Sequence, residues 1–181
     1  IEIENSHNVE GGACYQLPQL RQVAEFARQH NIPVHIDGAR VFNASVATGI
    51  SVKKIASFAD TITFCLSKGL GAPVGSLLCG KKEFIQKARR IRKMLGGGMR
   101  QAGILAAAGI YALDHNVERL HKDHLHARHI AEALAQTDWA DIDTSSVETN
   151  IIYFDTPQFE ARRITSQLKK LGVLCNPTGP N

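Results

Sequence analysis

The sequence has few aromatic residues and cysteines, and it lacks any long apolar run. Aromatic residues make up 6% of the 181 residues, and the four cysteines, at positions 14, 65, 79 and 175, form no C-x-x-C pair. Neither a zinc ribbon nor a redox pair is therefore indicated, and we expect no metal site. No apolar stretch approaches the roughly 18 residues of a membrane span, so no membrane partner is expected. Cys65 and Cys79 lie in apolar runs and are expected to be buried free thiols of a reducing compartment, which favours the cytoplasm.

The net charge of +4 conceals one strongly basic segment. The segment from Lys81 to Arg100 contains eight basic residues and a single acidic one, Glu83. Its local charge is therefore +7, which leaves about −3 for the rest of the chain. A basic helix can bind nucleic acid, but no aromatic residues alternate with these charges, so nucleic acid is not the expected partner. The segment is equally consistent with a solvated helix face or with ligands for a phosphate.

Apolar runs alternate with helical periodicity along the chain. Strands are expected at 1–4, 34–37, 61–66, 74–79, 151–154 and 173–175, and helices at 17–31, 40–47, 52–58, 82–95, 100–113, 117–135 and 158–171. This alternation predicts an α/β fold with a mostly parallel sheet and helices on both faces. Residues 1–115 are expected to form part of a large domain, and residues 116–181 the start of a small α/β C-terminal domain. The first residue is Ile1 and residues 176–180 resemble a turn, so we expect a piece of a longer subunit.

Candidate functional side chains follow the end of an expected strand in the segment 35–40, His-Ile-Asp-Gly-Ala-Arg. Ligands of open α/β sheets bind outside the carboxyl ends of the strands. There Asp37 can hold a cationic ring nitrogen, and Arg40 can hold an anion. The alternative is a structural Asp–Arg pair or an N-cap, because an aspartate before a helix is common.

A second strand end with a candidate functional side chain is the segment 66–69, Leu-Ser-Lys-Gly. Lys68 follows an apolar run directly, and burial at this place would favour the neutral amine that attacks a carbonyl. The alternative is a lysine that extends to solvent from the sheet edge.

A third candidate is the glycine triplet at 96–98, flanked by Lys93 and Arg100. Glycines before a helix that begins near Arg100 can present backbone N–H groups to a phosphate or carboxylate. The alternative is a hinge, a common use of glycine triplets.

The three features together indicate a pyridoxal 5′-phosphate (PLP) enzyme. Asp37 precedes Lys68 by 31 residues, at the ends of two different strands. In such enzymes a carboxylate keeps the pyridine nitrogen protonated and a lysine forms the Schiff base. Segments 35–40, 65–76 and 92–103 resemble low-specificity L-threonine aldolases, and Glu-Asn-Ser-His-Asn at 4–8 is similar to that family's loop before the aspartate strand. Ser6 stands where threonine is more usual.

The resemblance implies a role for each matching residue. Lys68 would bind PLP covalently, Asp37 would pair with its ring nitrogen, and Arg40 would lie near its phenolic oxygen and the substrate. Further cofactor contacts would come from Ser67, Asn5, Arg100 and Lys93, the last two in a site shared between subunits of a homotetramer. His7 is the candidate base for the substrate hydroxyl. The implied reaction is retro-aldol cleavage of L-threonine, L-allo-threonine or another β-hydroxy-α-amino acid to glycine and an aldehyde, acetaldehyde for threonine.

Other interpretations stay open. A β-eliminating lyase or an aminotransferase of the same fold would share Asp37 and Lys68, and only the segment 96–101 favours the aldolase. The histidines at 121, 124, 126 and 129 resemble a metal cluster, but the interspersed charges favour a solvated helix face.

Overall fold

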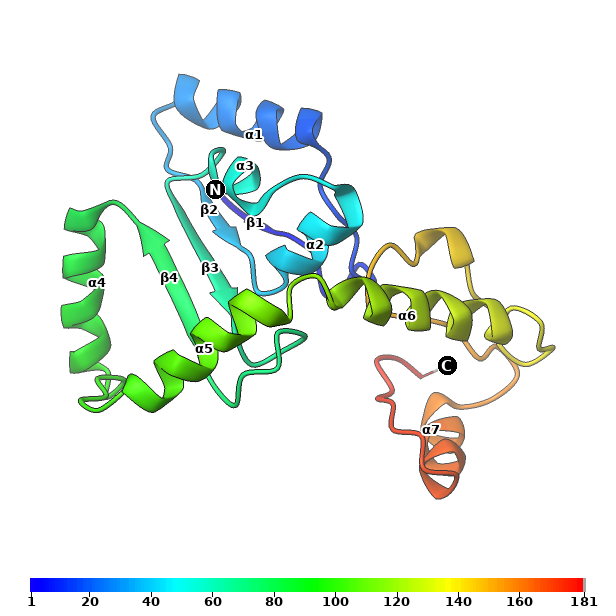
Figure 1. The fold of residues 1–181 in the computed structure, drawn as a ribbon. Coiled ribbons are helices and arrows are strands. Elements are labelled where there is room, and N and C mark those ends of the chain that lie inside the picture. Colours follow the sequence, from blue (N-terminus) through cyan, green and yellow to red (C-terminus); the bar gives the residue numbers. More distant parts are fainter. Residues whose placement is uncertain (181) are drawn as a thin grey trace.

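A computed structural model describes residues 1–180 and contains one four-stranded sheet (Figure 1). Its strands are β1 (Glu2–Glu4), β2 (His35–Asp37), β3 (Thr61–Cys65) and β4 (Ser76–Gly80). They lie in the order β1-β2-β3-β4, with β1, β2 and β3 parallel and β4 antiparallel to β3. The predicted α/β class with a mostly parallel sheet is therefore confirmed.

Seven α-helices and one short 3-10 helix accompany this sheet in the described part of the chain. They are α1 (Leu17–Gln29), α2 (Val41–Thr48), α3 (Val52–Ala56), α4 (Lys82–Met94), α5 (Gly103–His115), α6 (Leu120–Leu134), η1 (Thr144–Ser146) and α7 (Ala161–Lys170). Local signals account for several ends: Pro18 lies in the first turn of α1, and Gly49 ends α2 with φ +70°. None of the helices within residues 1–180 is both long and apolar enough to cross a membrane.

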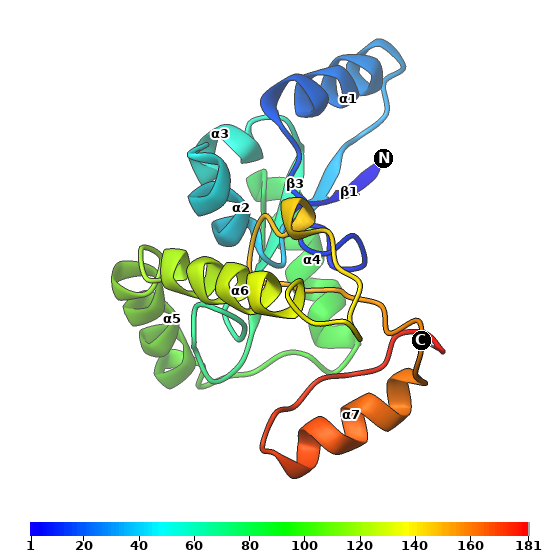
Figure 2. The same ribbon diagram turned by 90° about the vertical axis from the view of Figure 1, so that its right-hand side faces the viewer.

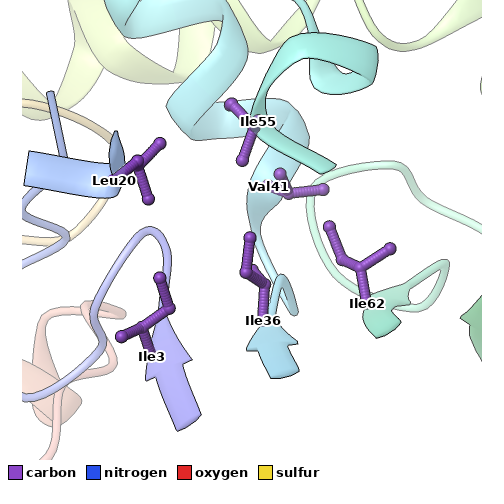
Figure 3. Close-up of a cluster of buried hydrophobic side chains, with 6 residues drawn as sticks. All are labelled: Ile3, Leu20, Ile36, Val41, Ile55 and Ile62. Carbon is purple, nitrogen blue, oxygen red and sulfur yellow. The ribbon is translucent and has the colours of Figure 1, made fainter. Parts of the chain in front are cut away.

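The main core lies between the sheet and the first three helices (Figure 3). Ile3, Ile36 and Ile62 stand side by side across β1, β2 and β3, because strand register brings them to one face. Leu20, Val41 and Ile55, from α1, α2 and α3, pack against them. This cluster holds the carboxyl ends of β2 and β3 next to each other, which is where the sequence places Asp37 and Lys68.

A second apolar cluster joins the segment after β3 to α5 and α6. It contains Leu66, Leu70, Ala72, Ala112 and Leu120, all buried. Helix α6 also packs against α2, while α7 lies away from the sheet (Figures 1 and 2). The loop that follows β3 is thus anchored to α5 and α6 by the buried side chains of Leu66, Leu70 and Ala72.

Two expected strands, at 151–154 and 173–175, are not strands in the structure. Their apolar residues favour extended backbone, but a strand needs a neighbour whose backbone it can pair with, and residues 1–180 offer them none. The region instead contains a single antiparallel bridge, between Asp141 and Asp155, with N–H to carbonyl distances of 2.8 and 2.9 Å.

The expected burial of Cys65 and Cys79 is also wrong. Cys79 is exposed and Cys65 is half-buried, whereas Cys14 is the buried thiol. Every residue of β4, one of the two edge strands of the described sheet, is exposed, because residues 1–180 leave its faces open. All four cysteines are free thiols.

Candidate active site

Asp37 is the last residue of β2, and the chain turns sharply after it. Its Oδ1 accepts a hydrogen bond of 2.9 Å from the backbone N–H of Ala39, while Oδ2 has no partner within residues 1–180. Gly38 permits the turn, because a Cβ there would lie 2.6 Å from the backbone oxygen of Thr63. The carboxylate is half-buried, with one oxygen available for a ligand.

Arg40 and Lys68 line the same small cavity. Its wall comes from the start of α2 and the segment after β3: Ala39, Arg40, Phe42, Asn43, Cys65, Lys68, Gly69 and Leu70. The structure therefore brings the ends of β2 and β3 together, as the sequence predicted. No ion pair within the described residues holds the amine of Lys68.

The expected burial of Lys68 is wrong, because both Lys68 and Ser67 are exposed. Strand β3 ends at Cys65, and the next residue, Leu66, turns into the second core cluster. Lys68 then begins a tight turn in which its carbonyl accepts a 2.9 Å hydrogen bond from Gly71 N–H. The lysine thus lies at the mouth of the cavity.

Asn5 and Ser6 form a buried polar pair directly beside β2. The backbone N–H of Asn5 donates to the carbonyl of Asp37 at 2.9 Å, and its Oδ1 accepts from Tyr15 N–H at 3.2 Å. Both side chains are fully buried, yet Asn5 Nδ2 and Ser6 Oγ have no hydrogen-bond partner among residues 1–180. Because buried polar atoms are normally paired, these two atoms are suited to a polar ligand.

His7 lies on the same loop but faces a different hollow. Its Nε2 is 3.7 Å from Glu4 Oε2, and its Nδ1 accepts a 3.2 Å hydrogen bond from Glu10 N–H. The hollow is lined by His7, Glu10, Ala13, Cys14, Tyr15 and Gln19, and is separate from the cavity of Arg40 and Lys68. The structure does not bring His7 into that cavity.

Lys93 and Arg100 are likewise not brought to the cavity. Lys93 is exposed near the end of α4, and Arg100 is exposed in the loop before α5 (Figure 1). The expected helix start near Arg100 is wrong, because α5 begins at Gly103, three residues later. Gly97 N–H donates to Arg92 O at 2.9 Å, which closes the end of α4.

Three polar residues near the cavity received no role from the sequence. Asn43 lines the cavity, while Asn116 and Arg119 donate to the carbonyls of Leu70 and Gly69. Asn116 lies between the two expected helices and Arg119 in the first turn of the second, and nothing local marks residues whose partners are 46 and 50 positions away.

The model of the family described as beta-eliminating lyase matches residues 1–157. The chain belongs to the beta-eliminating lyase family. The match includes every residue at the cavity and the whole sheet, so the family assignment and the architecture agree.

Curated relatives and solved structures are similar across most of the chain. It is 46% identical over 176 residues to the low specificity L-threonine aldolase of Escherichia coli K12, covering 97% of this chain and 51% of that protein. It is 44% identical over 177 residues to low-specificity L-threonine aldolase 1 of Arabidopsis thaliana, covering 96% and 49%. A crystal structure from Listeria monocytogenes, proposed to be an L-allo-threonine aldolase, has a TM-score of 0.84 at 21% identity, over 94% of this chain and 47% of that one. The chain therefore has the same fold as the Listeria protein. It spans about half the length of these relatives.

Proposed function

We propose that this chain carries the lysine, the aspartate and one arginine of a PLP-dependent aldehyde-lyase that cleaves β-hydroxy-α-amino acids. The observation that carries the proposal is that Arg40 and Lys68 line one small cavity just after the carboxyl ends of β2 and β3, with Asp37 as the last residue of β2. The identity to low-specificity L-threonine aldolases supports L-threonine and L-allo-threonine as substrates. We propose the activity for the whole subunit to which these residues belong, assembled as a cytoplasmic homotetramer.

The residues present fit PLP by their chemistry. A pyridinium nitrogen needs an anionic partner, and Asp37 offers an unpaired carboxylate oxygen at a strand end. An aldehyde needs an accessible amine, and Lys68 is exposed without an ion-pair partner among residues 1–180. The unpaired Asn5 Nδ2 and Ser6 Oγ supply further polar atoms beside Asp37. The donor set therefore matches an anionic, planar, aldehyde-bearing cofactor.

When bound, PLP supplies an electron sink that accepts the electrons of the breaking Cα–Cβ bond. The residues of this chain would bind the cofactor and hold it in a fixed orientation. Asp37 holds a proton on the ring nitrogen by charge, which lowers the energy of the electron-rich state. Lys68 would supply the amine that holds the cofactor. Arg40 would orient anionic oxygens of the cofactor or substrate.

The remaining roles complete the proposal. We keep His7 as the proposed base for the β-hydroxyl proton of the substrate because the resemblance implies it, although His7 lines a hollow separate from the cavity of Arg40 and Lys68. Asn5 and Ser67 contact the cofactor. Lys93, in the last turn of α4, and Arg100, in the loop before α5, would bind the phosphate of a neighbouring subunit's cofactor, in agreement with their exposure away from this chain's own cavity.

The first experiment tests Lys68 directly in the complete subunit. PLP is added and the absorbance at about 420 nm is recorded. Borohydride reduction then attaches the cofactor to the lysine as a stable label, which peptide mass spectrometry locates. We expect the label on Lys68, and its loss in Lys68→Ala. Lys53→Ala, which removes an exposed lysine on α3, is the matched control and keeps the label. A label on another lysine, or none, contradicts the proposal.

The second experiment separates the reaction types. The family description favours β-elimination as the second candidate. Release of glycine and acetaldehyde from L-threonine supports the aldehyde-lyase. Release of pyruvate and ammonia from L-serine, with no glycine from L-threonine, supports the β-eliminating lyase and overturns the first proposal.

A further inference from the structure

The turn that carries Lys68 is held by the connection between α5 and α6. Asn116 Nδ2 donates a 2.7 Å hydrogen bond to the carbonyl oxygen of Leu70. Arg119 Nη2 donates to the carbonyl of the preceding residue, Gly69, at 3.4 Å. Two successive carbonyls directly after Lys68 are therefore bound by side chains from one short segment about 50 residues further along the chain.

Apolar packing holds the same turn from its other side. Leu70 is 3% exposed and packs with Leu66 and Leu120 in the second core cluster. At Gly69 the backbone approaches α6 so closely that a Cβ would lie 2.7 Å from Leu120 Cδ2. Lys68 itself is exposed, so its side chain depends on the backbone behind it for a defined position.

We propose that Asn116 is a positioning residue for Lys68, and that Arg119 assists it. The inference rests on the proposed function, because it states that contacts made two residues after Lys68 determine where the Lys68 amine points. A reacting group must be held within about 0.5 Å of its productive place, and an exposed turn cannot do this without support from its neighbours. The Asn116 bond is short, 2.7 Å, and it is directed at the carbonyl of Leu70, the third residue of the turn that begins at Lys68.

The test uses Asn116→Asp in the PLP-loaded complete subunit. Aspartate keeps the size of the side chain, removes the N–H donor and places a carboxylate against the Leu70 carbonyl. We expect cofactor affinity and kcat each to fall about tenfold, with KM changed less than about twofold. The visible circular dichroism per bound cofactor, which arises because the site fixes the ring, should also decrease. Arg128→Ala, on the exposed side of α6, is the matched control and leaves all four quantities unchanged.

The readouts distinguish positioning from simple stabilisation. A lower unfolding temperature of the cofactor-free protein, with kcat and circular dichroism per bound cofactor unchanged, overturns the inference. If Asn116→Asp does not fold, Arg119→Met, which keeps the aliphatic stem, takes its place. A smaller decrease in kcat and dichroism then supports the inference, and wild-type values overturn it. Failure of the wild-type protein to bind PLP through Lys68 overturns the proposed function, and this inference with it.

Discussion

The side-chain amide of Asn43 lies 3.1 Å from Nε2 of His124 and joins α2 to α6. Asn43 is almost fully buried and also lines the cavity of Arg40 and Lys68. An amide N–H can donate to Nε2 only when that nitrogen carries no proton. The contact therefore requires a neutral His124 and connects the protonation of one imidazole to the wall of the candidate active site.

Stability should fall at acidic pH because of His124. Burial lowers the pKa of His124 from its ordinary 6.5, outweighing the opposite effect of Asp123, while His121 lowers it further. Because the folded pKa lies below the unfolded one, the unfolded state takes up the proton first as the pH falls. The contribution of His124 to stability is complete well above pH 6.5 and decreases between 6.5 and the lower folded pKa.

Urea unfolding at a series of pH values between 8 and 5 measures this effect. His124→Gln should have a weaker pH dependence than wild type, because glutamine does not titrate. His126→Gln, at an exposed position of the same helix, is the control and should keep the wild-type dependence. Equal slopes for His124→Gln and wild type would refute the assignment.

Cys14 should resist alkylation in the folded protein. Burial, reinforced by the charge and hydrogen bond of the Glu148 carboxylate, raises the pKa of Cys14 to about 12. The reactive thiolate is therefore almost absent at pH 8. With iodoacetamide and mass spectrometry we expect exposed Cys79 to be modified first and Cys14 only after unfolding. Glu148→Gln should leave Cys14 protected, since burial is the larger cause; labelling of Cys14 as fast as Cys79 would disprove this.

Gly12→Ala should destabilise the protein far more than Gly49→Ala. Both glycines have positive φ, +81° and +70°, so alanine at either place costs about 1 kcal/mol of backbone strain. A Cβ at Gly12 would also lie 2.1 Å from Oγ1 of the fully buried Thr149, whereas nothing lies within 4 Å at Gly49. We expect a total loss of about 3 kcal/mol for Gly12→Ala by thermal or urea unfolding. Equal losses of unfolding free energy for the two variants would show that the loop of Gly12 moves away from Thr149 without cost.

Ile36→Ala tests the core beneath the candidate active site. Ile36 is fully buried at the centre of the sheet, so truncation should cost about 2–5 kcal/mol of unfolding free energy. Ile104→Ala removes the same atoms from a side chain that is 85% exposed on α5, and should change stability by less than about 0.5 kcal/mol. Chemical denaturation of the two variants gives the comparison, and similar losses would place the core elsewhere.

The sequence predicted best what depends on local pattern. Apolar runs that end in glycine mark the ends of β2 and β3, so Asp37 and the Arg40–Lys68 cavity could be anticipated. It failed where exposure depends on distant residues. Lys68 was expected to be buried, but the chain turns Leu66 inward instead and leaves the lysine outside.

Pairing across long stretches of chain was equally hidden. Nothing in the residues near Asn116 reveals that its partner is the carbonyl of Leu70, 46 positions earlier. The apolar runs at 151–154 and 173–175 have strand composition, but composition does not supply a neighbouring strand. Cys79 has the sequence context of a core residue, but it lies on β4, where the described chain leaves every residue exposed.

The bond from Thr149 Oγ1 to the carbonyl of Gly12, 3.0 Å long, has a consequence for the order of folding. It joins residues 137 positions apart, and contacts that close such long loops form late, because the chain must first lose most of its freedom. The parallel strands can assemble earlier, from partners about 30 positions apart. We therefore expect the Gly12 end of this loop to become ordered after the sheet, whereas Asn5, bonded to the carbonyl of Asp37, becomes ordered with the sheet.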